Sequence, residues 1–157
     1  MQGLVPLFLV LHVLGAIVAF GATFAFPWLA GSGAREPEHA NFALRAITMV
    51  FDRWVFPLAL VQGLTGLGLI AGLGIDLLAT PWLLLGVTLY AVAVTFVLTV
   101  TMPNLRKLIA LTAPPPPSGA GGPPPEVAAR ASAARRNRTI QEALIVAIVF
   151  LMVMKPG

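Results

Sequence analysis

The chemistry that this sequence can offer centres on one histidine. His12 lies within a stretch from Gly3 to Ala30 that carries no formal charge. Imidazole can ligate haem iron, ligate copper or relay protons, and an ionisable side chain inside a membrane-spanning segment is a functional candidate by default. Two alternatives follow. In the favoured, structural alternative His12 is a neutral histidine that only bonds to a neighbouring helix, and no cofactor is predicted. In the other, His12 is the cofactor-binding residue for haem or a metal, or it transfers protons.

Gln62 is the predicted partner of His12 in that structural alternative. At about 1.5 Å per residue, each side chain lies roughly 12 Å into its own apolar stretch, counted from opposite ends. The two side chains form a predicted intramembrane polar pair. Small residues share their helix faces, and in a bilayer such faces allow two helices to approach closely. The predicted helix-packing residues are Gly15, Ala19, Gly63 and Gly66.

Other reactive groups are scarce. The chain has no cysteine, which excludes disulfides, thiolate metal sites and iron-sulfur clusters. No pair of carboxylates lies in the apolar stretches, and no Ser-His-Asp arrangement, phosphate loop or metal-spaced cluster is visible, so we predict no catalytic residue and no metal site. A haem between helices usually takes a second axial ligand, and the other histidine, His39, lies outside the apolar stretches. A five-coordinate haem, a methionine partner or a ligand from a second chain remain open.

The composition requires a membrane. Of the 157 residues, 58% are hydrophobic and 10% are charged, and the mean hydropathy is +0.91. A water-soluble core of this size could not bury so much apolar surface, and the charges are excluded from long blocks instead of recurring along helix faces. The net charge of +4 is assigned to contacts with the lipid bilayer, and we predict no nucleic acid partner.

Four blocks are long enough to be helices that cross about 30 Å of hydrocarbon. Gly31 to Gly33 is expected to break the first helix, and Pro57 to kink the second near its start. Segment 114–125, rich in proline and glycine, is expected to be a cytoplasmic linker. The predicted fold is one all-α domain, a transmembrane four-helix bundle, with helices at about 4–30, 54–74, 81–105 and 127–154.

The orientation follows from lysine and arginine. Nine of the ten cationic residues lie after the first and third predicted helices. Because cytoplasmic loops carry an excess of these residues, both termini are expected on the extracytoplasmic side of a multi-pass protein of a bacterial inner membrane. The predicted contacts with lipid headgroups or with a partner are Arg130, Arg135, Arg136 and Arg138.

Short segments spread along the chain resemble one family, the DUF2269 family of predicted integral membrane proteins. The resemblance implies a four-helix membrane protein and assigns no activity, because the function of that family is undefined. The segments that carry it are Leu11–Ile17 and Pro27–Leu29 in the first helix, Gln62–Gly66 in the second, Pro103–Leu108 at the end of the third, and Leu151–Gly157 at the C-terminus.

The first helix is also similar to that of two four-helix groups, the HemJ-type protoporphyrinogen oxidases and the CopD-type copper proteins. In the first group a histidine of helix one works with a lysine of helix three. This chain has no lysine or arginine in the body of its third apolar stretch, so that oxidase activity is not implied. The resemblance directs attention to His12 and leaves its role open.

Together these patterns favour a non-enzymatic membrane protein that packs with itself or within a larger membrane complex through its glycine- and alanine-rich faces. The alternative is a haem-binding or redox membrane protein that uses His12. A third hypothesis is a small transporter or proton-relay protein, in which His12 and Gln62 would line the pathway.

Overall fold

The helices of this protein are joined so that four long rods cross the molecule. The computed structural model describes residues 2–114 and 122–156, and within those ranges it contains no strand. Turns η1 (Gln2–Leu4) and η2 (Pro37–His39) precede two of the helices, and π-helical segments η3 (Phe51–Val55) and η4 (Val97–Thr101) join others without a gap. The α-helices are α1 (Val5–Thr23), α2 (Phe26–Arg35), α3 (Ala40–Val50), α4 (Phe56–Leu73), α5 (Pro81–Phe96), α6 (Met102–Leu111) and α7 (Pro125–Met154).

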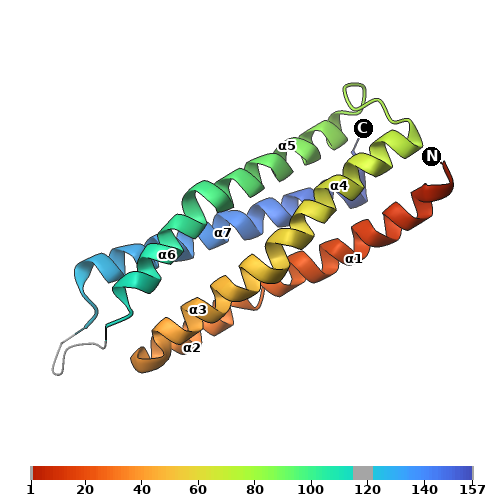
Figure 1. Ribbon diagram of the computed structural model, residues 1–157. Helices are drawn as coiled ribbons and strands as arrows, with labels where there is room; N and C mark the ends of the chain where they lie inside the picture. Colours follow the sequence, from red (N-terminus) through yellow and green to blue (C-terminus); the bar gives the residue numbers. More distant parts are fainter. Residues whose placement is uncertain (1, 115–121, 157) are drawn as a thin grey trace.

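Each rod is long and apolar enough to span a membrane, so the predicted all-α transmembrane four-helix bundle is confirmed. The four candidate spans are Val5–Arg35, Ala40–Leu73, Pro81–Leu111 and Pro125–Met154. Both termini and the connection from α4 to α5 lie at one end of the bundle, here called the termini end (Figure 1). The opposite end, where the chain passes from α6 to α7, is called the linker end.

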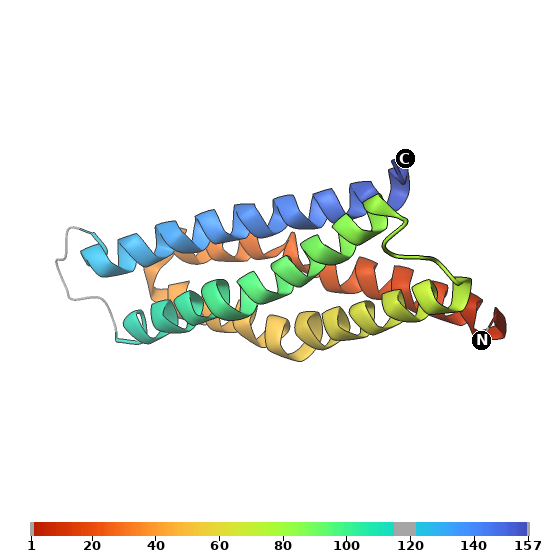
Figure 2. The ribbon, with the colours of Figure 1, turned by 90° about the horizontal axis from the view of Figure 1, so that it is seen from above.

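Prolines bend three of the four rods. Proline lacks the N–H that would donate to the carbonyl four residues earlier, and its ring clashes with that carbonyl. The structure shows the disturbance at that offset each time: α1 ends at Thr23 before Pro27, η3 is centred on Arg53 before Pro57, and η4 is centred on Thr99 before Pro103. The rod formed by α7 has no proline after its first residue and runs without interruption (Figure 2).

The prediction for the end of the first helix and the start of the second was wrong. Gly31 to Gly33 lies inside α2, and the helix breaks only at Glu36. The second rod begins at Ala40, well before the predicted start at Trp54. Gly33 explains why the helix continues, because a Cβ placed there would lie 2.8 Å from Cβ of Ala43 on α3, so the missing side chain lets α2 and α3 pack closely.

The predicted linker 114–125 falls mostly on residues 115–121, which lie outside the described residues. Its described part ends in Pro125, the first residue of α7. Proline is suited to this position, because the N–H of a first helical residue has no partner within the helix. The third rod continues through Pro103 to Leu111, beyond the predicted boundary at 105, because η4 absorbs the disturbance.

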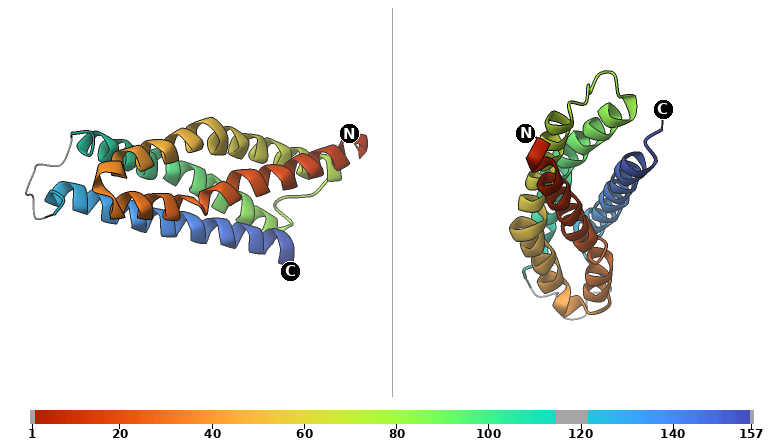
Figure 3. Two further views of the ribbon diagram at one scale, coloured as in Figure 1. Left: turned by 90° about the horizontal axis from the view of Figure 1, so that it is seen from below. Right: turned by 90° about the vertical axis from the view of Figure 1, so that its right-hand side faces the viewer.

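The rods form two pairs. Helix α1 packs against α4 and α2 against α3, while α5 and α6 pack against α7. The pairs meet at the linker end through a cluster of buried residues, Ile47, Val97, Met102 and Leu105. Toward the termini end α1 and α7 diverge, which the end-on and lower views show (Figure 3).

The lengths of the rods exceed a bilayer. About 30 Å of hydrocarbon corresponds to about 20 helical residues, which, counted from the termini end, reaches roughly Ala25, Arg53, Thr101 and Ala134. Trp28 and Trp54 lie near this level and are 80% and 64% exposed, as expected for indoles in a headgroup layer. Helices α2, α3 and α6 and the first turns of α7 therefore extend past the hydrocarbon at the linker end.

Candidate functional site

His12 lies between α1 and α4. Its Nδ1 is 3.1 Å from the backbone carbonyl oxygen of Gln62 and 3.1 Å from the hydroxyl of Thr65. The Thr65 hydroxyl already donates to backbone carbonyls of its own helix, at 2.9 Å to Val61, so Nδ1 carries the proton that both oxygens share. This tautomer leaves Nε2 with a free lone pair, which is the state in which a histidine can ligate a metal or accept a proton.

Gln62 contacts His12 through its backbone and not through its amide. The side-chain Oε1 of Gln62 is buried without a hydrogen-bond partner, and it packs against Gly15, where a Cβ would lie 2.9 Å away. The hydroxyl partner that sequence reasoning missed is Thr65, which lies one turn after Val61 and is buried. The sequence could have indicated Thr65 as a partner of His12, because Thr65 lies three residues after Gln62 on the same helix face.

The four predicted packing residues all lie where helices approach. Gly15 and Ala19 are the buried residues of α1, and Gly15 lies against the Gln62 side chain of α4. On α4, a Cβ at Gly66 would meet the His12 ring at 3.1 Å, and a Cβ at Gly63 would meet the Tyr90 ring of α5 at 3.2 Å. The small side chains therefore create the space that the two rings occupy.

A second polar group lies on α7, where Arg138 and Glu142 are one turn apart. Nε of Arg138 is 3.5 Å from Oε1 of Glu142, and the two side chains are 33% and 27% exposed. That distance is too long for a hydrogen bond, and both atoms are buried without another partner. Counted from Met154 at about 1.5 Å per residue, Glu142 lies roughly 18 Å from the termini end, within the hydrocarbon layer.

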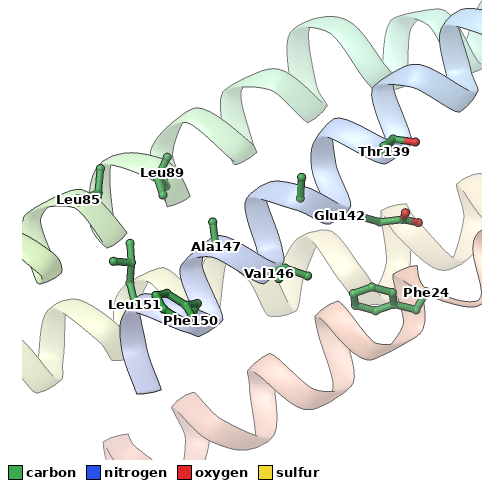
Figure 4. A pocket seen from close by; sticks show the side chains of 10 residues that line it. Phe24, Leu85, Leu89, Thr139, Glu142, Val146, Ala147, Phe150 and Leu151 are labelled. Atoms are coloured by element: carbon green, nitrogen blue, oxygen red, sulfur yellow. The ribbon is translucent and has the colours of Figure 1, made fainter. Parts of the chain in front are cut away.

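Glu142 faces outward into an open groove along α7. The groove has a volume of about 750 Å³, and α7 supplies most of its lining between Thr139 and Leu151. Phe24 borders it beside Glu142, and Leu85 and Leu89 of α5 border it nearer the termini end (Figure 4). Sequence reasoning missed this site, although Glu142 shares its helix face with Val146 and Phe150 at the expected spacing.

An interior cavity of about 60 Å³ lies among all four rods, at the level of the bends. Tyr90 of α5 crosses there and donates from its hydroxyl to the backbone carbonyl of Ala59 on α4. Gln141 of α7 also lines the cavity, with a buried Oε1 that has no partner. Because nearly all of the lining is apolar, this small cavity has the character of a dry packing defect and not of a ligand site.

The predicted basic contacts lie along α7 toward the linker end. Arg135 and Arg136 are exposed, while Arg130 is partly buried and pairs with Glu126 at 3.1 Å. Arg138 lies closest to the groove and pairs with Glu142. Of the four arginines, two are thus exposed and two pair with a glutamate of the same helix.

A haem or metal at His12 would have to use ligands from elsewhere. In the described ranges no group of three or more His, Cys, Asp or Glu side chains could hold a metal ion. His39 lies in η2 at the linker end, where its Nδ1 bonds to Glu36 at 2.9 Å. His12 lines neither the groove nor the interior cavity.

Comparison with known proteins places the chain in one family. No curated protein and no solved structure matches it, so the similarity of its first helix to the HemJ-type and CopD-type proteins gains no support. The family model described as "Predicted integral membrane protein (DUF2269)" matches residues 6–156. With nearly the whole chain matched and four rods able to cross a bilayer, the protein is an integral membrane protein and belongs to the DUF2269 family.

Proposed function

We propose that this protein is a non-catalytic subunit of a membrane assembly, and that it works by docking a transmembrane helix in the groove along α7. The observation that carries the proposal is Glu142 in the lining of the groove, with Arg138 one turn earlier on the same helix at 3.5 Å. Ionisable side chains inside a bilayer almost always face protein or water, because exposure to acyl chains is costly. A carboxylate on an outward face at this depth therefore indicates that another helix covers it.

The length of the groove favours a helix over a lipid chain as the occupant. The lining runs from Thr139 to Leu151, which at about 1.5 Å per residue is roughly 18 Å along the bilayer normal. Measured from the termini end, it extends from about 4 Å to about 22 Å and so crosses the middle of a layer about 30 Å thick. The acyl chains of one leaflet end near that middle, whereas a transmembrane helix passes through it.

The chemistry of the groove defines the helix that it would accept. Ala143 and Ala147 lie one turn apart in its lining, and paired small residues let two helix backbones approach closely in lipid. Glu142 calls for a donor or a cationic side chain at the same depth. The expected partner is thus an apolar helix with a small-residue face and one such polar group, in a bacterial inner membrane with the termini end outside, as the distribution of arginine supports.

Position-specific photo-crosslinking in native membranes tests this proposal. A photoreactive residue replaces Val146, which is 58% exposed in the groove, and as a control it replaces Leu64, which is 69% exposed on α4. The expected result is a product between Val146 and a peptide of a membrane-spanning helix, identified by mass spectrometry, with no such product from Leu64. Lipid adducts alone at Val146, or equal protein products at both positions, would contradict the proposal.

His12 supports a second candidate function, a haem-binding or redox membrane protein. The specific observation is that Nδ1 is held by Gln62 and Thr65, which fixes the ring and leaves Nε2 free, as in many metal-ligating histidines. The protein purified in mild detergent from haem-supplied cells would then show a Soret band that is lost in His12→Ala. A colourless preparation from those cells would exclude this candidate.

A further inference from the structure

The groove face of α7 is complementary to itself. Within one stretch of the helix, Ala143 and Ala147 make a shallow trough, and Val146 and Phe150, which are 58% and 57% exposed, stand beside it. A second α7 laid against the first at a crossing angle of about −40° could place its Val146 and Phe150 over that trough. An interface in which one patch supplies both shapes is the kind that a two-fold dimer uses.

The charges on the same face are also self-complementary. Arg138 and Glu142 lie one turn apart, about 6 Å along the axis, which a long arginine side chain can reach. Nε of Arg138 and Oε1 of Glu142 are buried without a hydrogen bond, whereas the two side chains are 33% and 27% exposed, so the remaining atoms of each head group can bond elsewhere. Two copies in one membrane have the same orientation, and their α7 helices therefore run parallel. Arg138 of each copy could then pair with Glu142 of the other.

We infer that the helix docked in the groove is α7 of a second copy of this chain, in a parallel two-fold dimer with Ala143 and Ala147 at the closest approach and Arg138–Glu142 pairs exchanged between copies. This inference rests on the proposed function and names its partner. The exposed face of α1 offers no comparable argument, because its exposed residues, such as Leu14 and Ile17, are apolar.

Cysteine cross-linking in membranes tests the inference, since the chain has no cysteine of its own. Two differently tagged copies carrying Ala143→Cys are co-expressed and oxidised, and Ala147→Cys is treated in the same way. The matched control is Ala91→Cys, an exposed alanine on α5 outside the groove. The expected result is a disulfide-linked pair carrying both tags from Ala143→Cys and Ala147→Cys, and none from Ala91→Cys.

A bulky side chain provides the second measurement. Ala143→Ile fills the trough and is expected to weaken self-association in detergent roughly tenfold, which corresponds to about 1.4 kcal/mol. Ala91→Ile is expected to leave self-association unchanged. Equal cross-linking at Ala91 and Ala143, or self-association that Ala143→Ile does not alter, would overturn the dimer.

The two proposals fail in different ways. If photo-crosslinking from Val146 captures a helix of another protein and the two-tag pair is absent, the self-dimer is wrong and the docking function stands. If Val146 captures only lipid, the docking function itself is wrong. A two-tag disulfide at Ala143 together with a Val146 product that contains only peptides of this chain supports both.

Discussion

Glycine matters most for helix packing in this protein where an added side chain would meet atoms that cannot move aside. Gly33 on α2 lies opposite α3, and a Cβ there would be 2.8 Å from Cβ of Ala43 and 3.2 Å from Cα of Ala40. Neither neighbour is a flexible side-chain end that could move aside. Gly31 lies two residues earlier on the same helix, with nothing within 4 Å of the same position. Helix α2 thus contains one glycine, Gly33, with no room for a side chain and another, Gly31, with open space around it.

Substitution of Gly33 by alanine is expected to destabilise the protein by about 1–3 kcal/mol, because the added methyl forces α2 and α3 apart. Gly31→Ala is the matched control, and it is expected to be neutral or to stabilise by up to about 1 kcal/mol because alanine favours helix. Denaturant unfolding in mild detergent measures both changes. Equal effects of the two substitutions would contradict the close packing of this helical hairpin.

At the scale of elements, prolines decide the shape of the rods. In each bent rod the disturbance lies about four residues before the proline, where the carbonyl loses its donor. The long rod from Pro81 to Leu111 contains two prolines in different settings. Pro81 is its first residue, where no N–H is needed, whereas Pro103 follows the π-helical segment η4.

Replacement of Pro103 by alanine restores an N–H that can bond to the carbonyl of Thr99, so η4 is expected to tighten and the rod to straighten. Spin labels at Leu84 and Leu111, which are 37% and 36% exposed, would then report a longer mean distance. Pro81→Ala is expected to leave that distance unchanged. No change after Pro103→Ala would mean that tertiary packing, and not proline, holds the bend.

At the scale of the molecule, two helix pairs are joined by few polar contacts. Asn41 of α3 donates from Nδ2 to the backbone carbonyl of Ile109 at 2.8 Å and to the hydroxyl of Thr112 at 3.0 Å, both after or within α6. Tyr90 bonds across the pairs nearer the middle of the bundle. At the linker end the buried cluster around Met102 adds apolar contact. The linker end therefore holds the two pairs together, while α1 and α7 diverge at the other end.

Asn41→Ala is expected to lower the free energy of unfolding by about 1–3 kcal/mol, because it removes both bonds that Asn41 donates to α6 and to Thr112 after it. Phe42→Ala is the matched control, since the neighbouring side chain is 65% exposed and its removal is expected to cost little. Thermal unfolding in detergent compares the two variants. An Asn41→Ala protein as stable as the parent would show that the Asn41 bonds do not hold the pairs together.

The orientation of the whole molecule can be tested with single cysteines. Leu78→Cys lies at the termini end, where Leu78 is 81% exposed, and it is expected to react with a membrane-impermeant thiol reagent added to intact cells. Ser132→Cys, at an exposed position of α7 near the linker end, is expected to react only after permeabilisation. The reverse pattern would show that the arginine-rich end faces outward and would invert the predicted topology.

The sequence by itself determined the fold class and the number of spans. Blocks without charge must leave water, and within lipid every backbone group must bond inside its own segment, so composition alone specifies four helices. The sequence also located the starts of α5 and α7 at Pro81 and near Pro125. It failed at Gly31 to Gly33, because glycine weakens an isolated helix but here provides the close approach of α2 to α3, which no local rule contains.

Only the tertiary structure decided which polar groups meet. His12 and Gln62 were paired by depth, yet the contact uses a backbone carbonyl and Thr65, since the rotation of α4 about its axis sets which atoms face α1. Glu142 and Arg138 lie one turn apart on one helix, and that spacing is local. Glu142 faces outward into a groove because of where α5 and the end of α1 lie beside α7. The sequence does not predict that arrangement, because a membrane helix is apolar on every side and its pattern does not show which side faces a neighbour.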